Sequence, residues 1–148
     1  MPAFVPHEIW HGAQFDGTLT GSPVDFDTDT IKLALIDDTL APDEAVHDNW
    51  DDLAANEVSG TGYTAGGETL TITVDQTGAV MTVDSGDTTW AVDLGGFSDA
   101  RYAVWYKVGG SDATSPIIGH MDMGSDKGNA AGPLTLETPN GILTSTIT

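Results

Sequence analysis

The stretch Arg101-Tyr-Ala-Val-Trp-Tyr-Lys-Val108 decides the predicted fold of this chain. Its β-branched and aromatic residues fall on both alternating faces, which is typical of a strand covered by protein on both sides. We therefore predict that this strand lies in the centre of a sheet. Other apolar runs, separated by turn-forming residues, predict further strands at 31–36, 70–74, 80–83, 90–92, 117–123, 134–137 and 142–147.

These segments together predict an all-β fold, an antiparallel β-sandwich of about eight strands. The pair Asn140-Gly141 predicts a hairpin between the last two strands, because both residues tolerate a positive φ. One short helix is predicted at about 42–55, where Pro42 suits the first helical position. Apolar residues in this segment are spaced to share one helical face: Val46, Trp50 and Leu53.

The length of 148 residues and the hydrophobic content of 39% suit a single domain with one core. Proline and glycine interrupt every short apolar run near the N-terminus. We predict an extended, irregular N-terminal arm over residues 1–24 and a single β-sandwich domain over residues 25–148. The sequence contains no cysteine, which excludes disulfides, thiolate metal sites and cysteine nucleophiles from this chain.

The chain carries 23 Asp and Glu against 4 Lys and Arg, a formal net charge of −19 at pH 7. Such a negative potential repels phosphate backbones and anionic lipids, so neither nucleic acid nor a membrane is an expected partner. The acids are dispersed along the sequence, and lysine is nearly absent. This pattern is typical of a surface that stays hydrated in concentrated salt, where charge repulsion is screened. We therefore expect a halophilic source.

The stretch His7-Glu-Ile-Trp-His11 matches the HExxH spacing, which on a helix places two imidazoles and a glutamate around zinc. Pro6 precedes this stretch and Gly12 follows it, and so short a helix is marginal in water. We interpret the motif as a chance match in an extended arm and predict no zinc site.

Asp25, Asp27 and Asp29 alternate along one segment and could offer oxygen ligands to calcium. The segment lacks the ligand order of an EF-hand, so a solvated acidic face is our interpretation and structural calcium is the alternative. The glycine-rich loop 60–67 lacks the Lys-Ser/Thr pair of a phosphate-binding loop, and no serine lies in a Gly-x-Ser-x-Gly elbow. We predict no catalytic residues, no cofactor and no enzymatic activity.

Five segments occur in this order: Asp27-Thr-Asp-Thr-Ile-Lys-Leu-Ala-Leu35, His47-Asp-Asn-Trp-Asp-Asp52, Glu57-Val-Ser-Gly-Thr-Gly-Tyr-Thr-Ala-Gly-Gly67, Ala100-Arg-Tyr-Ala-Val-Trp-Tyr-Lys107 and Ala113-Thr-Ser-Pro-Ile-Ile-Gly-His-Met-Asp-Met-Gly124. Together they resemble a family of small structural proteins of tailed phages. The resemblance covers roughly residues 25–148, and His120 and Met123 stand where the family tends to carry aromatic residues. It implies a non-enzymatic β-domain of a virion that is assembled in the host cytoplasm. The acidity adds the expectation of a tailed virus with a halophilic host, such as a haloarchaeon.

We expect a decoration or cement protein on the outside of the head, whose partners are the major capsid protein, other virion proteins and copies of itself. Such a protein needs a small rigid domain and an arm that reaches a neighbour. Apolar residues in the arm need a place to bury, which makes four of them candidate assembly contacts: Phe4, Ile9, Trp10 and Phe15. The alternative is that the arm packs on its own domain.

Two other classes of protein stay open at this point. A tail, fibre or baseplate component would share the β composition and the acidity. A carbohydrate-binding module would place tryptophans flat on its surface to stack on sugars, whereas a decoration protein predicts that Trp50, Trp90 and Trp105 are buried.

Overall fold

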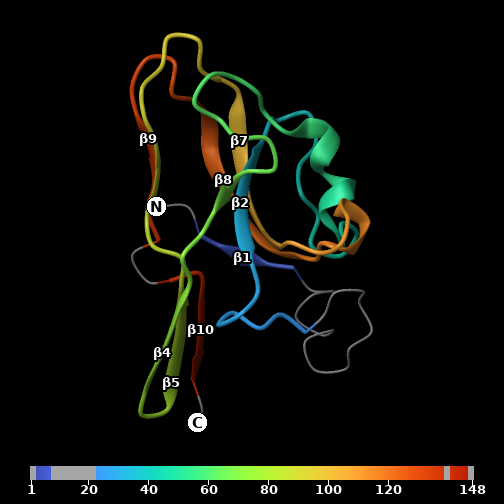
Figure 1. The fold of residues 1–148 in the computed structure, drawn as a ribbon, viewed down its shortest axis with the longest axis vertical. Helices are drawn as coiled ribbons and strands as arrows, with labels where there is room; N and C mark the ends of the chain where they lie inside the picture. The colour runs from blue at the N-terminus through green and yellow to red at the C-terminus, as the bar shows by residue number, and fades with distance from the viewer. Residues whose placement is uncertain (1–2, 8–22, 139–140, 147–148) are drawn as a thin grey trace.

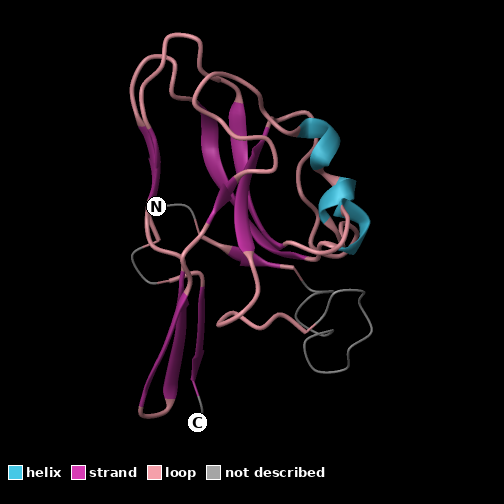
Figure 2. Ribbon diagram, in the orientation of Figure 1, coloured by secondary structure: helices cyan, strands magenta, loops and turns pink. Residues whose placement is uncertain are grey.

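A computed structural model of the chain describes residues 3–7, 23–138 and 141–146. The described residues form an all-β fold in which the strand pairs are antiparallel (Figures 1 and 2), so the predicted fold class is confirmed. None of the helical segments in this part of the chain has the length and hydrophobicity to cross a membrane.

The largest sheet has five strands in the order β1-β8-β7-β2-β3. Their bounds are β1 Val5–Pro6, β2 Ile31–Ile36, β3 Glu68–Thr69, β7 Ala100–Lys107 and β8 Ile117–Lys127. β7 pairs with β2 along one edge and with β8 along the other. The prediction that this strand is central is therefore confirmed.

Apolar clusters cover both faces of this sheet, which explains the apolar residues on both faces of β7. On one face, Trp105 belongs to a core shared with Trp90 and Leu136 of a small two-stranded sheet. The strands of that sheet are β6 Thr88–Trp90 and β9 Leu134–Leu136. On the opposite face, Trp50 stacks on Tyr106, with ring centroids 4.8 Å apart. Figure 1 shows β9 and the helical turns on opposite sides of the central strands.

The helix predicted at about 42–55 is wrong, because the segment forms short 3-10 turns instead of an α-helix. Tertiary contacts engage backbone groups that an α-helix would use in its own hydrogen bonds. The Trp50 amide donates to the Ser115 carbonyl over 2.9 Å, and the Asp48 carbonyl accepts from the Ile117 amide over 2.9 Å. The 3-10 turns of the described chain are η1 Trp50–Asp52, η2 Ala54–Asn56 and η3 Asp112–Thr114.

The turns still place two of the three predicted apolar side chains in the core. Trp50 and Leu53 are buried, whereas Val46 is 63% exposed. Val46 therefore does not share a buried face with Trp50 and Leu53, as the predicted helix required.

A third sheet projects from the body of the protein, as Figure 1 shows at the bottom of the view. Its strands are β4 Thr73–Thr77, β5 Val80–Asp84 and β10 Leu143–Thr146, in the order β10-β5-β4. The predicted hairpin across Asn140-Gly141 is wrong, because β9 pairs with β6 while β10 pairs with β5. Gly141 has a φ of 72°, and a Cβ atom there would collide with the Val83 carbonyl. Because Gly141 has no side chain, its backbone can lie directly against Val83 of β5.

Candidate functional site

Figures 1 and 2 show the projecting sheet β10-β5-β4 extending away from the body of the protein. Most of its residues are exposed. All five residues of β4 are exposed, and the exposed fraction of Val74 is 48%. In β5, Val83 is buried at the end that meets the body, while Val80 at the far end is 38% exposed. A sheet with so little buried surface contributes little to the core, and its residues are accessible to another molecule.

The outer part of the projecting sheet carries little charge, although the chain as a whole carries a net charge of −19. Asp75 is the one charged residue between Leu70 and Val83, Asp84 ends β5 where this strand meets the body, and no charged residue lies between Thr138 and Thr148. The central parts of protein interfaces are depleted of charged residues, because bringing charges out of water is unfavourable. The charge distribution therefore indicates this sheet as a contact surface.

The edges of the two larger sheets differ in length. The five-stranded sheet ends in β1 and β3, which have two residues each. Such short edge strands limit accidental pairing with other chains. The projecting sheet ends instead in β4 with five residues and in β10 with four, and within the described chain neither has a strand on its outer side. Open edges of this length allow another strand to be added.

The N-terminal residues 3–7 pack on their own domain. Phe4, one of the predicted assembly contacts, meets Trp105 edge-on with ring centroids 5.2 Å apart. Gly119 of β8 makes this approach possible, because a Cβ atom there would overlap the Phe4 ring. The other three predicted contacts lie outside the described residues: Ile9, Trp10 and Phe15.

His7, the first residue of the HExxH stretch, follows β1 and is 1% exposed. Its Nδ1 atom lies 2.9 Å from the His47 carbonyl oxygen, and its Nε2 atom lies 3.1 Å from Nδ1 of His120. Burial lowers the pKa of both rings, that of His120 to about 4. Both nitrogens of His7 are thus engaged in fixing the N-terminal segment, and the rest of the motif, 8–11, lies outside the described residues.

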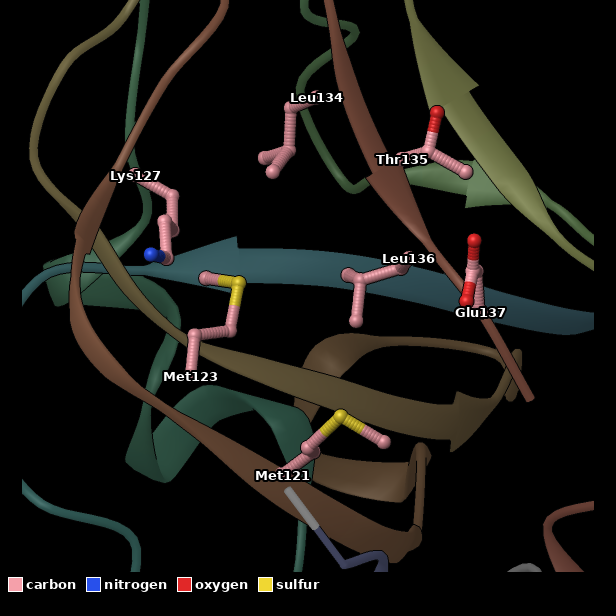
Figure 3. A pocket seen from close by; sticks show the side chains of 7 residues that line it. All are labelled: Met121, Met123, Lys127, Leu134, Thr135, Leu136 and Glu137. Atoms are coloured by element: carbon pink, nitrogen blue, oxygen red, sulfur yellow. The ribbon is translucent and has the colours of Figure 1, made fainter. Parts of the chain in front are cut away.

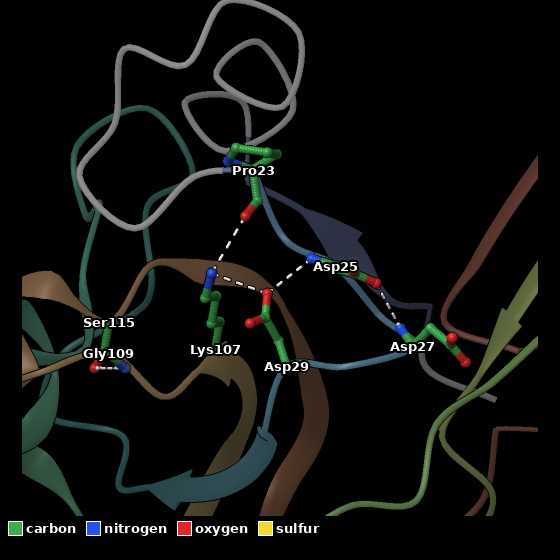
Figure 4. A network of polar contacts seen from close by, with 7 residues as sticks. All are labelled: Pro23, Asp25, Asp27, Asp29, Lys107, Gly109 and Ser115. Atoms are coloured by element: carbon green, nitrogen blue, oxygen red, sulfur yellow. Dashed lines mark hydrogen bonds and ion pairs between the residues drawn. The ribbon is translucent and has the colours of Figure 1, made fainter.

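The alternating aspartates form a turn that is tied to β7 (Figure 4). The Asp25 amide donates to Oδ2 of Asp29 over 2.8 Å, and the Asp27 amide donates to Oδ1 of Asp25 over 3.0 Å. Lys107 forms an ion pair with Asp29 at 2.9 Å and donates to the Pro23 carbonyl over 3.2 Å. Two of the three carboxylates therefore build the turn. The described residues contain no group of three or more side chains suited to a metal ion.

The loop from Glu57 to Gly67, part of the phage-like resemblance, is held by its own polar side chains. Oε1 of Glu57 accepts from the Tyr63 hydroxyl over 2.8 Å and from the Gly66 amide over 2.6 Å. The Tyr63 hydroxyl in turn accepts from the Leu35 amide of β2 over 2.9 Å. Burial raises the pKa of Glu57. The Glu57 carboxylate and the Tyr63 hydroxyl therefore hold the loop against the sheet, which is a structural role.

A small apolar groove lies between β8 and β9, with a volume of about 260 Å³ (Figure 3). Met121 and Met123 line it from β8, and Leu134 and Leu136 line it from β9. Its volume is below that of ordinary small-molecule pockets, so it suits one or two apolar side chains.

The prediction that Trp50, Trp90 and Trp105 are buried is confirmed, because none is more than 2% exposed. These three rings are therefore inaccessible to a sugar, and Trp10 lies outside the described residues. An aromatic platform for carbohydrate is not formed by them.

Sequence reasoning missed the pairing of His7 with His120 and the open edge of β4. His120 had one sequence feature to mark it, since the resemblance described above would place an aromatic residue at this position. The outer part of the projecting sheet had another, since Asp75 is the one charged residue between Leu70 and Val83 in a strongly acidic chain. No family model, no curated protein and no solved structure matches this chain.

Proposed function

We propose that this chain is a structural protein of a tailed-virus particle, a decoration or cement protein on the outside of the head. The observation that carries the proposal is the projecting, exposed sheet, whose outer part holds a single charged residue, Asp75, in a strongly acidic chain. A particle protein has to contact neighbours repeatedly through a rigid surface, and an open-edged sheet provides one. The resemblance of residues 25–148 to phage structural proteins supports the same role.

The net charge of −19 supports an outer position. Packaged DNA would repel such a protein, whereas the outer surface of a particle is in contact with solvent. In concentrated salt the repulsion between neighbouring acidic bodies is screened over about 3 Å. We therefore propose that the protein functions on particles that encounter brine, as a virus of a halophilic host would.

The direct test is analysis of purified particles of the virus that encodes this chain. We expect quantitative mass spectrometry to find many copies per particle and a reconstruction to place them on the outer surface of the head. Absence of the chain from particles would contradict the structural role altogether. Density in the tail would show that the chain is a tail component and would contradict the proposed position on the head.

A further inference from the structure

We infer that residues 3–7 form an acid-released strap. At neutral pH the hydrogen bond between His7 and His120 holds the strap on β8, and protonation of both rings detaches it while the rest of the domain stays folded. Such a release is a property of the isolated chain, so it goes beyond the proposed function and does not depend on it.

The strap has one deeply buried anchor, and that anchor is a histidine. Among residues 3–7, His7 is buried, Phe4 and Val5 are half-buried, and Ala3 and Pro6 are exposed. The strand within the strap, β1, has only two residues. A segment with so little buried surface can detach without unfolding the body of the protein. Docking of the strap therefore depends on the surroundings of His7.

Three hydrogen bonds hold His7 in place. Its amide donates to the Ile118 carbonyl over 3.1 Å, and its Nδ1 atom lies 2.9 Å from the His47 carbonyl oxygen. Because a carbonyl oxygen only accepts, Nδ1 of His7 carries the proton and Nε2 presents a lone pair. Nδ1 of His120 lies 3.1 Å from this Nε2 atom. The bond between the two rings therefore requires that one of the facing nitrogens is unprotonated.

The pair can hold one additional proton but not two. After one proton is added, neutral His120 can carry its hydrogen on Nε2 and accept from Nε2–H of charged His7. After a second proton is added, both facing nitrogens carry hydrogens, and two positive rings face each other. Protonation of both rings therefore converts the anchor into a repulsive contact.

Charged and titratable groups surround the two rings in the described part of the chain. They come from the segment before η1, from β7 and from β8: Asp43, Glu44, His47, Asp48, Arg101, Tyr102 and Asp122. The carboxylates of Asp43, Glu44 and Asp122 favour charged rings, whereas His47 disfavours them. Burial outweighs these carboxylates, so the pKa of both paired rings is lowered, that of His120 to about 4.

The lowered pKa values give the direction of the pH effect. Histidine that is free in solvent titrates near 6.5, so the released state binds more protons than the docked state below that pH. Docking is therefore strongest above pH 6.5 and weakens as the pH falls. A return of the His120 pKa from about 4 to 6.5 weakens docking up to about 300-fold, and His7 adds to this loss.

Release uncovers two surfaces that the strap covers. Phe4 lies edge-on against Trp105, with ring centroids 5.2 Å apart, and β1 occupies the outer edge of β8 at Gly119 and His120. Detachment therefore frees Phe4, one of the candidate assembly contacts, and opens the edge of an 11-residue strand. The strap thus makes these surfaces accessible only in acid.

The test is a pH titration of the full chain in molar KCl, followed by NMR of its backbone amides. Below about pH 5, we expect the amides of Val5 and His7 to lose their strand-like chemical shifts and their protection from solvent exchange. The amides of Ala34 in β2 and Val104 in β7 report on the body, and we expect them to keep both properties at that pH.

The decisive variant is His120→Gln, because glutamine does not titrate and its amide can either donate or accept. It can donate to neutral His7, and after a flip of the amide it can accept from charged His7. We therefore expect the strap of this variant to stay docked to a pH at least about one unit lower than in the wild type.

Three outcomes would overturn the strap. One is a wild type whose Val5 and His7 amides are unchanged at about pH 4. Another is a loss of the strap and body signals at the same pH, which would show unfolding of the whole domain. The third is release of His120→Gln at the wild-type pH.

A second measurement applies if His120→Gln does not dock its strap at neutral pH. The imidazole ¹⁵N shifts of the wild type report the protonation of each ring, and release should coincide with the second proton taken up by the pair. Release while both rings are neutral would contradict the mechanism. All these measurements use the isolated chain, so their failure leaves the proposed role on a particle to its own test.

Discussion

The Nε2 atom of His7 lies 3.1 Å from the Nδ1 atom of His120, although 113 positions separate these residues in the sequence. The partners of His7 determine which nitrogens carry protons. A carbonyl oxygen only accepts, so Nδ1 of His7 must donate to the His47 carbonyl. Nε2 of neutral His7 must then accept from Nδ1–H of His120. The pair holds the N-terminal segment on β8 while both rings are neutral.

The first prediction is a loss of stability in mild acid. The pKa of His120 is lowered to about 4 and that of His7 is also lowered, because burial disfavours the charged rings. The carboxylates of Asp43, Glu44 and Asp122 oppose this effect without cancelling it. Unfolded histidine has a pKa near 6.5, so the unfolded chain binds more protons below that value. The free energy of unfolding should fall by about 2 kcal/mol between pH 7 and pH 4.

The measurement is urea unfolding at a series of pH values. His120→Phe should show a flatter dependence over this range, since one of the two titrating rings is gone. A His120→Phe curve parallel to that of the wild type would show that other groups cause the acid sensitivity.

The second prediction concerns Asn129, which is fully buried. Its Oδ1 atom accepts from the Phe97 amide over 3.0 Å, and its Nδ2 atom donates to the carbonyls of Ala91 and Thr61 over 2.9 and 3.2 Å. Asn129→Ala should lower the free energy of unfolding by about 3 kcal/mol, because it leaves the buried Phe97 amide and two part-buried carbonyls without this partner.

Asn56→Ala is the control for this change. Asn56 also donates a side-chain hydrogen bond, to the Thr39 hydroxyl, but at an exposed position. Its loss should lower stability by less than about 1 kcal/mol, because water replaces the bond. Equal losses from the two variants in chemical denaturation would contradict the role of Asn129 in joining the loops.

The third prediction compares two glycines with similar backbone conformations. Gly67 has a φ of 81° and Gly78 a φ of 62°. A Cβ atom on Gly67 would overlap the Leu33 carbonyl, whereas a Cβ atom on Gly78 meets nothing within 4 Å. Gly78→Ala should cost about 1 kcal/mol from backbone strain alone, and Gly67→Ala about 3 kcal/mol or more. Thermal unfolding of both variants decides whether close packing makes the difference.

The fourth prediction is that salt stabilises the folded chain. With a net charge of −19, the folded state suffers strong self-repulsion, and molar salt screens it. The melting temperature should rise from low salt to molar KCl. A higher melting temperature in low salt would contradict the proposed adaptation to brine.

Local sequence patterns predicted the strands well where side chains alone decide the conformation. The prediction for 31–36 matches β2, and the two-faced apolar pattern of 101–108 correctly placed β7 in the centre of its sheet. Both predictions rest on which side chains are buried, and that property repeats with a period of two along a strand. The helix predicted for 42–55 does not form, because the Trp50 amide donates to the carbonyl of Ser115, which is distant in sequence, instead of to a carbonyl within the segment.

By itself, the sequence determined the all-β class, the acidic surface, the burial of the central tryptophans and the near absence of charge in the β4 and β10 regions. Only the tertiary structure decided that β10 joins β5 instead of β9, that His7 meets His120, and that among the described residues no strand pairs with the outer side of β4. The physical reason is that a side-chain pattern records how much of a strand is covered. It does not record which strand covers it, because the backbone groups that pair strands are the same in nearly every residue.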